Sequence, residues 1–152
     1  MKLYFLRHGK ANWPNWGGPD EDRPLTPAGK KEVHAVAQLL VRLKVAPDLI
    51  LTSPLVRTEQ TATIAAEHLG VKCRENKCLK PGFDLALLRR LQSRYAGKTL
   101  LLVGHEEDFS RVIASLTKGR IKLAKAGVAL VDRAETEQAR LRWLLPPEAA
   151  TT

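Results

Sequence analysis

The feature that most constrains the fold is an alternation between short apolar runs and longer segments with helical periodicity. Residues 2–7 contain the apolar run Leu3-Tyr4-Phe5-Leu6 and are interpreted as a buried strand, and 99–103 is a continuous apolar run, which is typical of a strand covered on both faces. In the segment from Thr26 to the residue before Pro47, apolar residues recur every three or four positions. Strands that alternate with such helices predict an α/β protein, a three-layer α/β/α sandwich with a mostly parallel central sheet.

The same pattern extends over nearly all of the 152 residues. Helices are expected to begin at Thr26 and Ser53, because each is followed by a proline at the first helical position. One domain is expected over residues 1–145, with a flexible tail at 146–152. The expected strands are 2–7, 48–52, 71–74, 99–103, 126–131 and 139–145, and the expected helices are 26–46, 53–70, 83–95 and 108–116.

Composition and charge narrow the classes of function. The chain is 44% hydrophobic and 27% charged, with no apolar run of the ~20 residues that a bilayer span needs, so we expect a cytoplasmic protein without a membrane partner. A net charge of +9 predicts attraction to anions. The basic residues are scattered without interleaved aromatic residues, which disfavours nucleic acid as the partner. Cys73 and Cys78 are interpreted as ordinary thiols, not as a metal site.

Three predicted strand ends carry chemically distinctive residues. The first strand ends in Arg7-His8-Gly9, the second leads into Ser53 through Arg57, and the fourth ends in Gly104-His105-Glu106. In parallel sheets, ligands bind just beyond the carboxyl ends of the strands. Gly9 would let the backbone approach a ligand closely or adopt a positive φ. These segments are therefore expected to meet at one edge of the sheet.

Two arginines and two histidines at one sheet edge suit a phosphoryl group. Arginine binds phosphate oxygens through paired hydrogen bonds and keeps its charge at any relevant pH. Phosphoryl transfer depends mainly on holding oxygens and compensating charge. Each residue taken alone also has a simpler interpretation: His8 as an exposed loop residue, Arg57 as a solvated surface residue, and His105 as a structural histidine.

The motifs together resemble the histidine phosphatase superfamily, which has the phosphoglycerate mutase-like fold. The short chain and the sequences Arg23-Pro-Leu-Thr-Pro-Ala-Gly and Ser53-Pro-x-x-Arg57-x-x-Gln-Thr-Ala are similar to the SixA-type phosphohistidine phosphatases. The resemblance implies that His8 is the nucleophile and that Arg7 and Arg57 bind phosphate oxygens, with Gly9 beside them. It further implies that His105 stabilises the transition state, and that neither a metal nor another cofactor is required.

A general acid is the part of the family pattern that the sequence leaves open. Many relatives use a carboxyl group from a loop after the third strand, where this chain offers Asp84, although Asp84 is interpreted first as a helix cap. Glu106 and Glu107 are the rival candidates. The lack of a clear acid favours a phosphohistidine substrate, because imidazole, with a pKa of about 6.5, leaves more easily than an alkoxide.

The loop at 9–25 is expected to form the rim of an open site, with Asn12, Trp13 and Arg23 as candidate substrate contacts and Trp16 beside them. Simple packing is an equally good interpretation for the tryptophans. Ala11 and Pro14 replace the Thr and Asn of the mutase-like relatives, which makes mutase activity doubtful. The expected partner is a phosphorylated protein domain of a signalling or carrier protein. The alternatives are a small phosphate ester and a catalytically silent phospho-binding module. The sequence does not fix the oligomeric state, and we favour a monomer.

Overall fold

The central sheet contains six strands within residues 1–151, which are the residues that the computed structural model describes. The strands are β1 (Leu3–Arg7), β2 (Leu49–Thr52), β3 (Cys73–Glu75), β4 (Leu100–Gly104), β5 (Val128–Asp132) and β6 (Arg140–Leu145), in the spatial order β3-β2-β4-β1-β5-β6. Strands β1 to β4 are mutually parallel, and β5 is antiparallel to both of its neighbours. The predicted mostly parallel sheet is confirmed.

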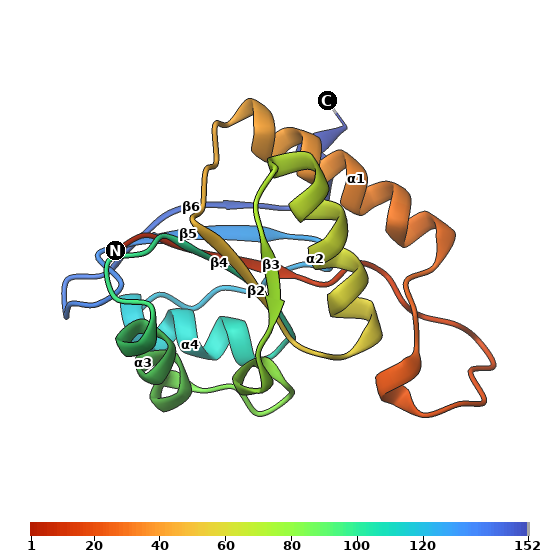
Figure 1. Cartoon of the computed structure of the whole chain (residues 1–152), viewed down its shortest axis with the longest axis horizontal. Helices are drawn as coiled ribbons and strands as arrows, with labels where there is room; N and C mark the ends of the chain where they lie inside the picture. The colour runs from red at the N-terminus through yellow and green to blue at the C-terminus, as the bar shows by residue number, and fades with distance from the viewer. Residues whose placement is uncertain (152) are drawn as a thin grey trace.

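Helices cover both faces of this sheet (Figure 1). On one side lie α1 (Pro27–Arg42) and α2 (Val56–Leu69), and on the other lie α3 (Leu85–Arg94) and α4 (Asp108–Thr117). Short 3-10 turns η1 (Asp20–Asp22), η2 (Lys77–Leu79) and η3 (Pro147–Ala150) connect or follow these elements. The predicted three-layer α/β/α sandwich is therefore confirmed. Within the described residues, no helix is both long and apolar enough to cross a bilayer.

Each face of the sheet has its own hydrophobic core because successive strand residues point to opposite faces. In β1, Leu3 and Phe5 pack toward α3 and α4, whereas Tyr4 and Leu6 pack toward α1 and α2. All four side chains are at most 6% exposed. The edge-to-face contact between Phe5 and Phe109, with ring centroids 5.2 Å apart, ties α4 to the sheet. Burial on both faces explains the continuous apolar run in the sequence.

Helix starts follow the predicted chemistry at two places and depart from it at a third. The Thr26 hydroxyl accepts a hydrogen bond from the Gly29 amide at 3.0 Å and caps α1, and Asp84 caps α3. The prediction that Ser53 caps α2 is wrong, because the N-cap position is Leu55. Ser53 and Pro54 instead form an extended connection, and the Ser53 hydroxyl is bonded to His105. The helix starts later because its expected cap has another partner.

The 3-10 turn η3 packs against the body of the protein. We expected a flexible tail at 146–152, but η3 contacts α1 and its Pro147 is buried. The third strand, expected at 71–74, lies at Cys73–Glu75 because only these residues pair with β2.

Candidate active site

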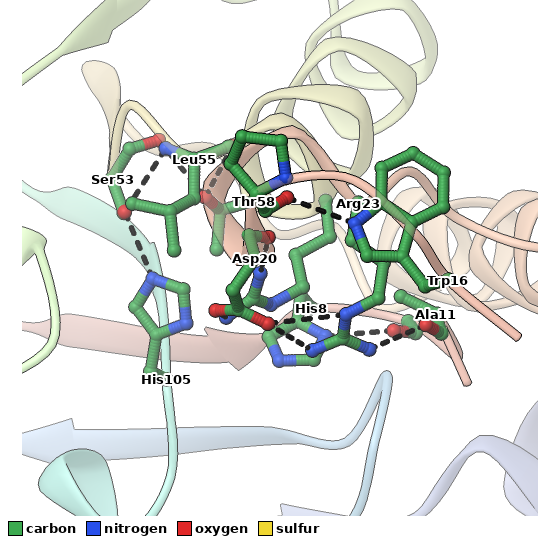
Figure 2. Close-up of polar contacts among 12 residues, drawn as sticks. His8, Ala11, Trp16, Asp20, Arg23, Ser53, Leu55, Thr58 and His105 are labelled. Carbon is green, nitrogen blue, oxygen red and sulfur yellow. Dashed lines mark hydrogen bonds and ion pairs between the residues drawn. The ribbon is translucent and has the colours of Figure 1, made fainter. Parts of the chain in front are cut away.

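A pocket of about 400 Å³ lies beyond the carboxyl ends of the parallel strands. The ends of β1 and β4 and the start of α2 supply the residues that the sequence singled out, and Figure 2 shows several of them converging. The residues lining the pocket are Arg7, His8, Ala11, Asn12, Arg23, Arg57, Pro81, His105, Glu106 and Lys125. The structure therefore brings the two arginines and two histidines into one site.

His8 is held in one tautomer by the backbone. Its Nδ1 lies 2.7 Å from the carbonyl oxygen of Gly9, and because a carbonyl only accepts, Nδ1 must carry the proton. Nε2 therefore keeps its lone pair. Burial lowers the pKa of His8 to about 4, and the positive charges of Arg57, Arg7 and Arg23 act in the same direction. At neutral pH the ring is uncharged and presents a nucleophilic nitrogen.

Gly9 has a packing role that the sequence did not predict. It does not line the pocket, and its amide donates to the Thr61 hydroxyl at 3.1 Å. A Cβ atom at this position would lie 2.6 Å from the Val33 side chain. The glycine thus permits close packing against α1, and its assignment to phosphate binding stays a prediction.

His105 is oriented by a chain of hydrogen bonds through Ser53. The Leu55 amide donates to the Ser53 hydroxyl at 3.3 Å, which leaves that hydroxyl free to donate to His105 Nε2 at 2.8 Å. With Ser53 as the donor, the ring proton is assigned to Nδ1, which lies on the side of the ring facing His8 in Figure 2. The two ring centroids are 5.5 Å apart. Burial lowers the pKa of His105 to about 3, so this ring is also neutral.

The half-buried Arg7 and the buried Arg57 are each anchored to the backbone by one guanidinium nitrogen. Arg7 Nη1 donates to the Leu123 carbonyl at 3.1 Å, and Arg57 Nη1 donates to the Asp20 carbonyl at 2.9 Å. Among the described residues, the Nε atoms of Arg7 and Arg57 are buried and have no partner. Both residues line the pocket, where their positive charges favour an anionic ligand.

Asp20 is the residue of the site that sequence reasoning missed. Its carboxylate lies between two arginines, 3.1 Å from Arg57 Nη2 and 2.9 Å from Arg23 Nη2 (Figure 2). Arg23 also donates to the Ala11 carbonyl. The hydrogen bond from Arg23 lowers the pKa of Asp20, and Arg57 adds to the effect. Asp20 is the first residue of the three-residue 3-10 turn Asp20–Asp22, which is too short to leave a periodic signal. The run of three acidic residues itself was visible in the sequence.

The carboxylates considered as general acids are engaged elsewhere. Asp84 accepts from the Leu87 amide at 2.9 Å as the cap of α3 and does not line the pocket. Glu106 does line it, but its carboxylate accepts from both the amide and the hydroxyl of Ser110. Glu107 forms an ion pair with Arg111 at 3.5 Å. The cap interpretation of Asp84 is confirmed.

The rim combines two pocket-lining residues, Asn12 and Arg23, with two loop-stabilising tryptophans. Asn12 lines the pocket as expected. Trp13 and Trp16 do not line it, and their indole N–H groups donate to the carbonyls of Pro24 and Pro19, at 2.8 and 2.9 Å. The tryptophans therefore hold the loop at 9–25 in shape. Pro81 and Lys125 complete the lining, although sequence reasoning had not singled them out.

The comparison with known proteins decides the family. The model of the histidine phosphatase superfamily, branch 1, matches residues 3–80. An uncharacterized protein of Picosynechococcus sp. is 37% identical, with 96% of this chain and all of the relative covered. The chain belongs to the histidine phosphatase superfamily.

Within this superfamily, the chain is similar to SixA proteins. The phosphohistidine phosphatase SixA of Escherichia coli is 25% identical, over 97% of this chain and 94% of the relative. The solved structure of the protein histidine phosphatase SixA complexed with tungstate has a TM-score of 0.88 and 26% identity, over 98% of this chain and 99% of that chain. These matches support a phosphatase with the phosphoglycerate mutase-like fold.

Proposed function

We propose that this phosphatase removes the phosphoryl group from phosphohistidine on a protein, through a phosphorylated His8 and without a metal ion. In this proposal Arg7 and Arg57 bind the phosphoryl oxygens, and His105 donates a hydrogen bond to one of them. Asn12 and Arg23 contact the substrate at the rim. The cytoplasmic location, the monomeric state and the extent of the catalytic domain, residues 1–145, stay predictions from the sequence.

The observation that carries the proposal is a neutral nucleophile that lines one pocket together with two guanidinium groups. The Nδ1 proton of His8 is committed to a carbonyl, so Nε2 has its lone pair available to attack phosphorus. Arg7 and Arg57 line the same pocket, and each carries a permanent positive charge. A phosphoryl group supplies both the electrophile and the acceptor oxygens. Charge-assisted hydrogen bonds of this kind stabilise the negative charge of the transferring group.

The reaction then has two displacement steps. His8 Nε2 forms a bond to phosphorus while the bond from phosphorus to the substrate ring breaks. The other nitrogen of the substrate ring carries a proton, so the group that leaves with the electron pair is neutral imidazole. Water next attacks the phosphorus of phosphorylated His8 and releases inorganic phosphate. The electron pair of the broken bond returns to Nε2, and the Nδ1–H···O=C bond to Gly9 can hold the ring in place through both steps.

The protonation states near the pocket favour imidazole as the leaving group. An alkoxide, whose parent acid has a pKa near the value of about 15.7 for water, needs a proton from a general acid. Asp20 is held ionised by Arg23 and Arg57, and Glu106 is bonded to Ser110. His105 is neutral, because burial lowers its pKa to about 3. Imidazole requires less assistance, and phosphohistidine is accordingly the substrate that this set of residues serves best.

A substrate panel and a trapping experiment test the proposal. The kcat/KM for phosphoimidazole and for a phosphohistidine peptide should be at least ~100-fold above that for phosphoserine and sugar phosphates. A factor of this size is what a general acid typically contributes, and the monoesters would lack that contribution here. A rapid quench should leave acid-labile phosphate on the wild type and none on His8→Ala. Activity should persist in excess chelator.

Each alternative has its own result. Equal or faster turnover of phosphate monoesters would replace the phosphohistidine substrate by a small phosphate ester. If the wild type turned over every donor no faster than His8→Ala does, the protein would be a phospho-binding module and not an enzyme. Loss of activity in chelator, restored by a divalent cation, would contradict the metal-independent mechanism.

A further inference from the structure

A second, basic groove adjoins the candidate active site. It has a volume of about 650 Å³ and shares Arg7 and Glu106 with the pocket. One wall comes from the loop between α4 and β5, where Arg120 and Lys122 line the groove and Lys125 lines the pocket itself. The groove and the pocket thus meet at Arg7 and Glu106, and both have cationic residues of this loop in their lining.

The backbone of this loop is fixed to the site. Arg7 Nη1 donates to the Leu123 carbonyl at 3.1 Å, and the Ala126 amide donates to the His8 carbonyl at 3.0 Å. The Leu123 amide donates in turn to the Ser110 hydroxyl at 3.1 Å. Arg120 and Lys122 are nevertheless exposed. Exposed cations on a fixed backbone can contact a partner without first ordering the loop.

Each of the two acidic groups of the groove lies near an arginine. Glu107 pairs with Arg111 at 3.5 Å, and Glu106 is bonded to Ser110 and lies near enough to Arg7 to affect its pKa. In residues 1–151, by contrast, no ion pair involves Arg120, Lys122 or Lys125. The groove therefore presents uncompensated positive charge beside the pocket.

We propose that this basic groove docks acidic residues that flank the phosphohistidine of a protein substrate, an inference that rests on the proposed function. Opposite charges across an interface raise association rates and discriminate between partners. The cations are spread along the groove on exposed side chains, which suits a protein surface better than a compact small anion. No aromatic residue lines the groove, so it lacks the stacking platforms typical of single-stranded nucleic acid sites.

The test uses two synthetic phosphohistidine peptides that differ only in having four Glu or four Gln residues around the phosphohistidine. With the full-length wild type at low salt, kcat/KM for the Glu peptide should exceed that for the Gln peptide by about tenfold, within the range of electrostatic steering. The difference should shrink toward onefold near 1 M salt, where the Debye length is about 3 Å. Arg120→Glu/Lys122→Glu should abolish or reverse the preference and change kcat/KM for phosphoimidazole less than about twofold.

A matched control is Arg42→Glu/Lys98→Glu, which makes the same change in net charge. Arg42 and Lys98 are exposed and precede β2 and β4, at the opposite end of the sheet from the pocket. This control should keep the preference for the Glu peptide. Equal kcat/KM values for the two wild-type peptides, or an equal loss of preference in both double variants, would overturn the docking proposal.

Two further measurements separate the remaining explanations. The wild type should bind the unphosphorylated Glu peptide, as measured by fluorescence anisotropy. The Arg120→Glu/Lys122→Glu variant should bind this peptide more weakly, even if phosphoimidazole is not a substrate. The failure of the proposed function and the failure of docking are thereby distinguishable. Tighter binding of a 20-nucleotide single-stranded RNA than of the Glu peptide, lost in the same variant, would assign the groove to nucleic acid and overturn the proposal.

Discussion

The state of His8 is set by one carbonyl and by burial, so its titration is the most direct check at the residue scale. Burial lowers the pKa of His8 to about 4, with nearby guanidiniums contributing, whereas an exposed histidine titrates near 6.5. An NMR titration of the ring, assigned by comparison with His8→Asn, should therefore have its midpoint near 4. A midpoint near 6.5 would contradict a neutral, backbone-fixed nucleophile.

Asp20 yields a second prediction at this scale. Its carboxylate forms an ion pair with the Arg57 guanidinium, which a phosphoryl group would also bind in the proposed function. Asp20→Asn should lower the Kd for orthovanadate two- to fivefold, since an exposed ion pair contributes up to about 1 kcal/mol. The carboxylate is 65% exposed, which keeps the expected effect small. Isothermal titration calorimetry measures the change. Glu21→Gln, the same charge change at the next residue, should have little effect, and weaker binding by Asp20→Asn would contradict competition.

At the scale of elements, the packing of α1 against the loop after β1 positions the nucleophile. A Cβ atom on Gly29 would lie 2.2 Å from the Lys10 carbonyl oxygen. Helix propensity alone predicts that Gly29→Ala raises the free energy of unfolding by up to about 1 kcal/mol. Because the clash is with a backbone atom, we expect the substitution to lower this free energy instead. We expect a loss of about 2 kcal/mol in the free energy of unfolding, as for overpacked sites.

Urea denaturation measures this loss, and the chain offers a matched control. A Cβ atom on Gly17 would have no neighbour within 4 Å, so Gly17→Ala should change stability by less than about 0.5 kcal/mol. A Gly29→Ala variant as stable as the wild type would show that the contact is not needed to hold the loop.

Elements with periodic or continuously apolar sequence could be predicted, whereas those defined by single contacts could not. The run at Leu100–Gly104 and the capped start at Thr26 were recognisable because burial on both faces and capping leave local signals. The start of α2 was not, because the Ser53 hydroxyl bonds to His105, which is 52 residues away. Asp20 was missed for the same reason, since its partner Arg57 is 37 residues distant.

The candidate site, too, could be predicted from the sequence only in part. Four residues at strand and helix ends could be placed together because parallel topology brings those ends to one edge. The role of Gly9 could not be foreseen, because the clash that excludes a side chain comes from Val33 on α1. Long-range packing, which a single sequence does not record, decided this position.

For the whole molecule, two buried neutral histidines make stability depend on pH. Burial lowers the pKa of His8 to about 4 and that of His105 to about 3, whereas both titrate near 6.5 in the unfolded chain. Between these values the unfolded state binds more protons than the folded state, so the free energy of unfolding rises with pH. The stabilisation is fully present above about 6.5 and is lost as the pH falls toward 4.

The slope of that dependence provides the measurement. Each histidine that is protonated only in the unfolded chain contributes about 1.4 kcal/mol per pH unit. Urea unfolding of the wild type at several pH values between 4.5 and 6 should be compared with that of His105→Asn, in which every other titrating group is retained. The variant should have a slope lower by about 1.4 kcal/mol per unit, whatever its absolute stability, because slope and stability are separate readouts. Identical slopes would mean that His105 is protonated equally in both states, which is incompatible with a buried, neutral ring bonded to Ser53.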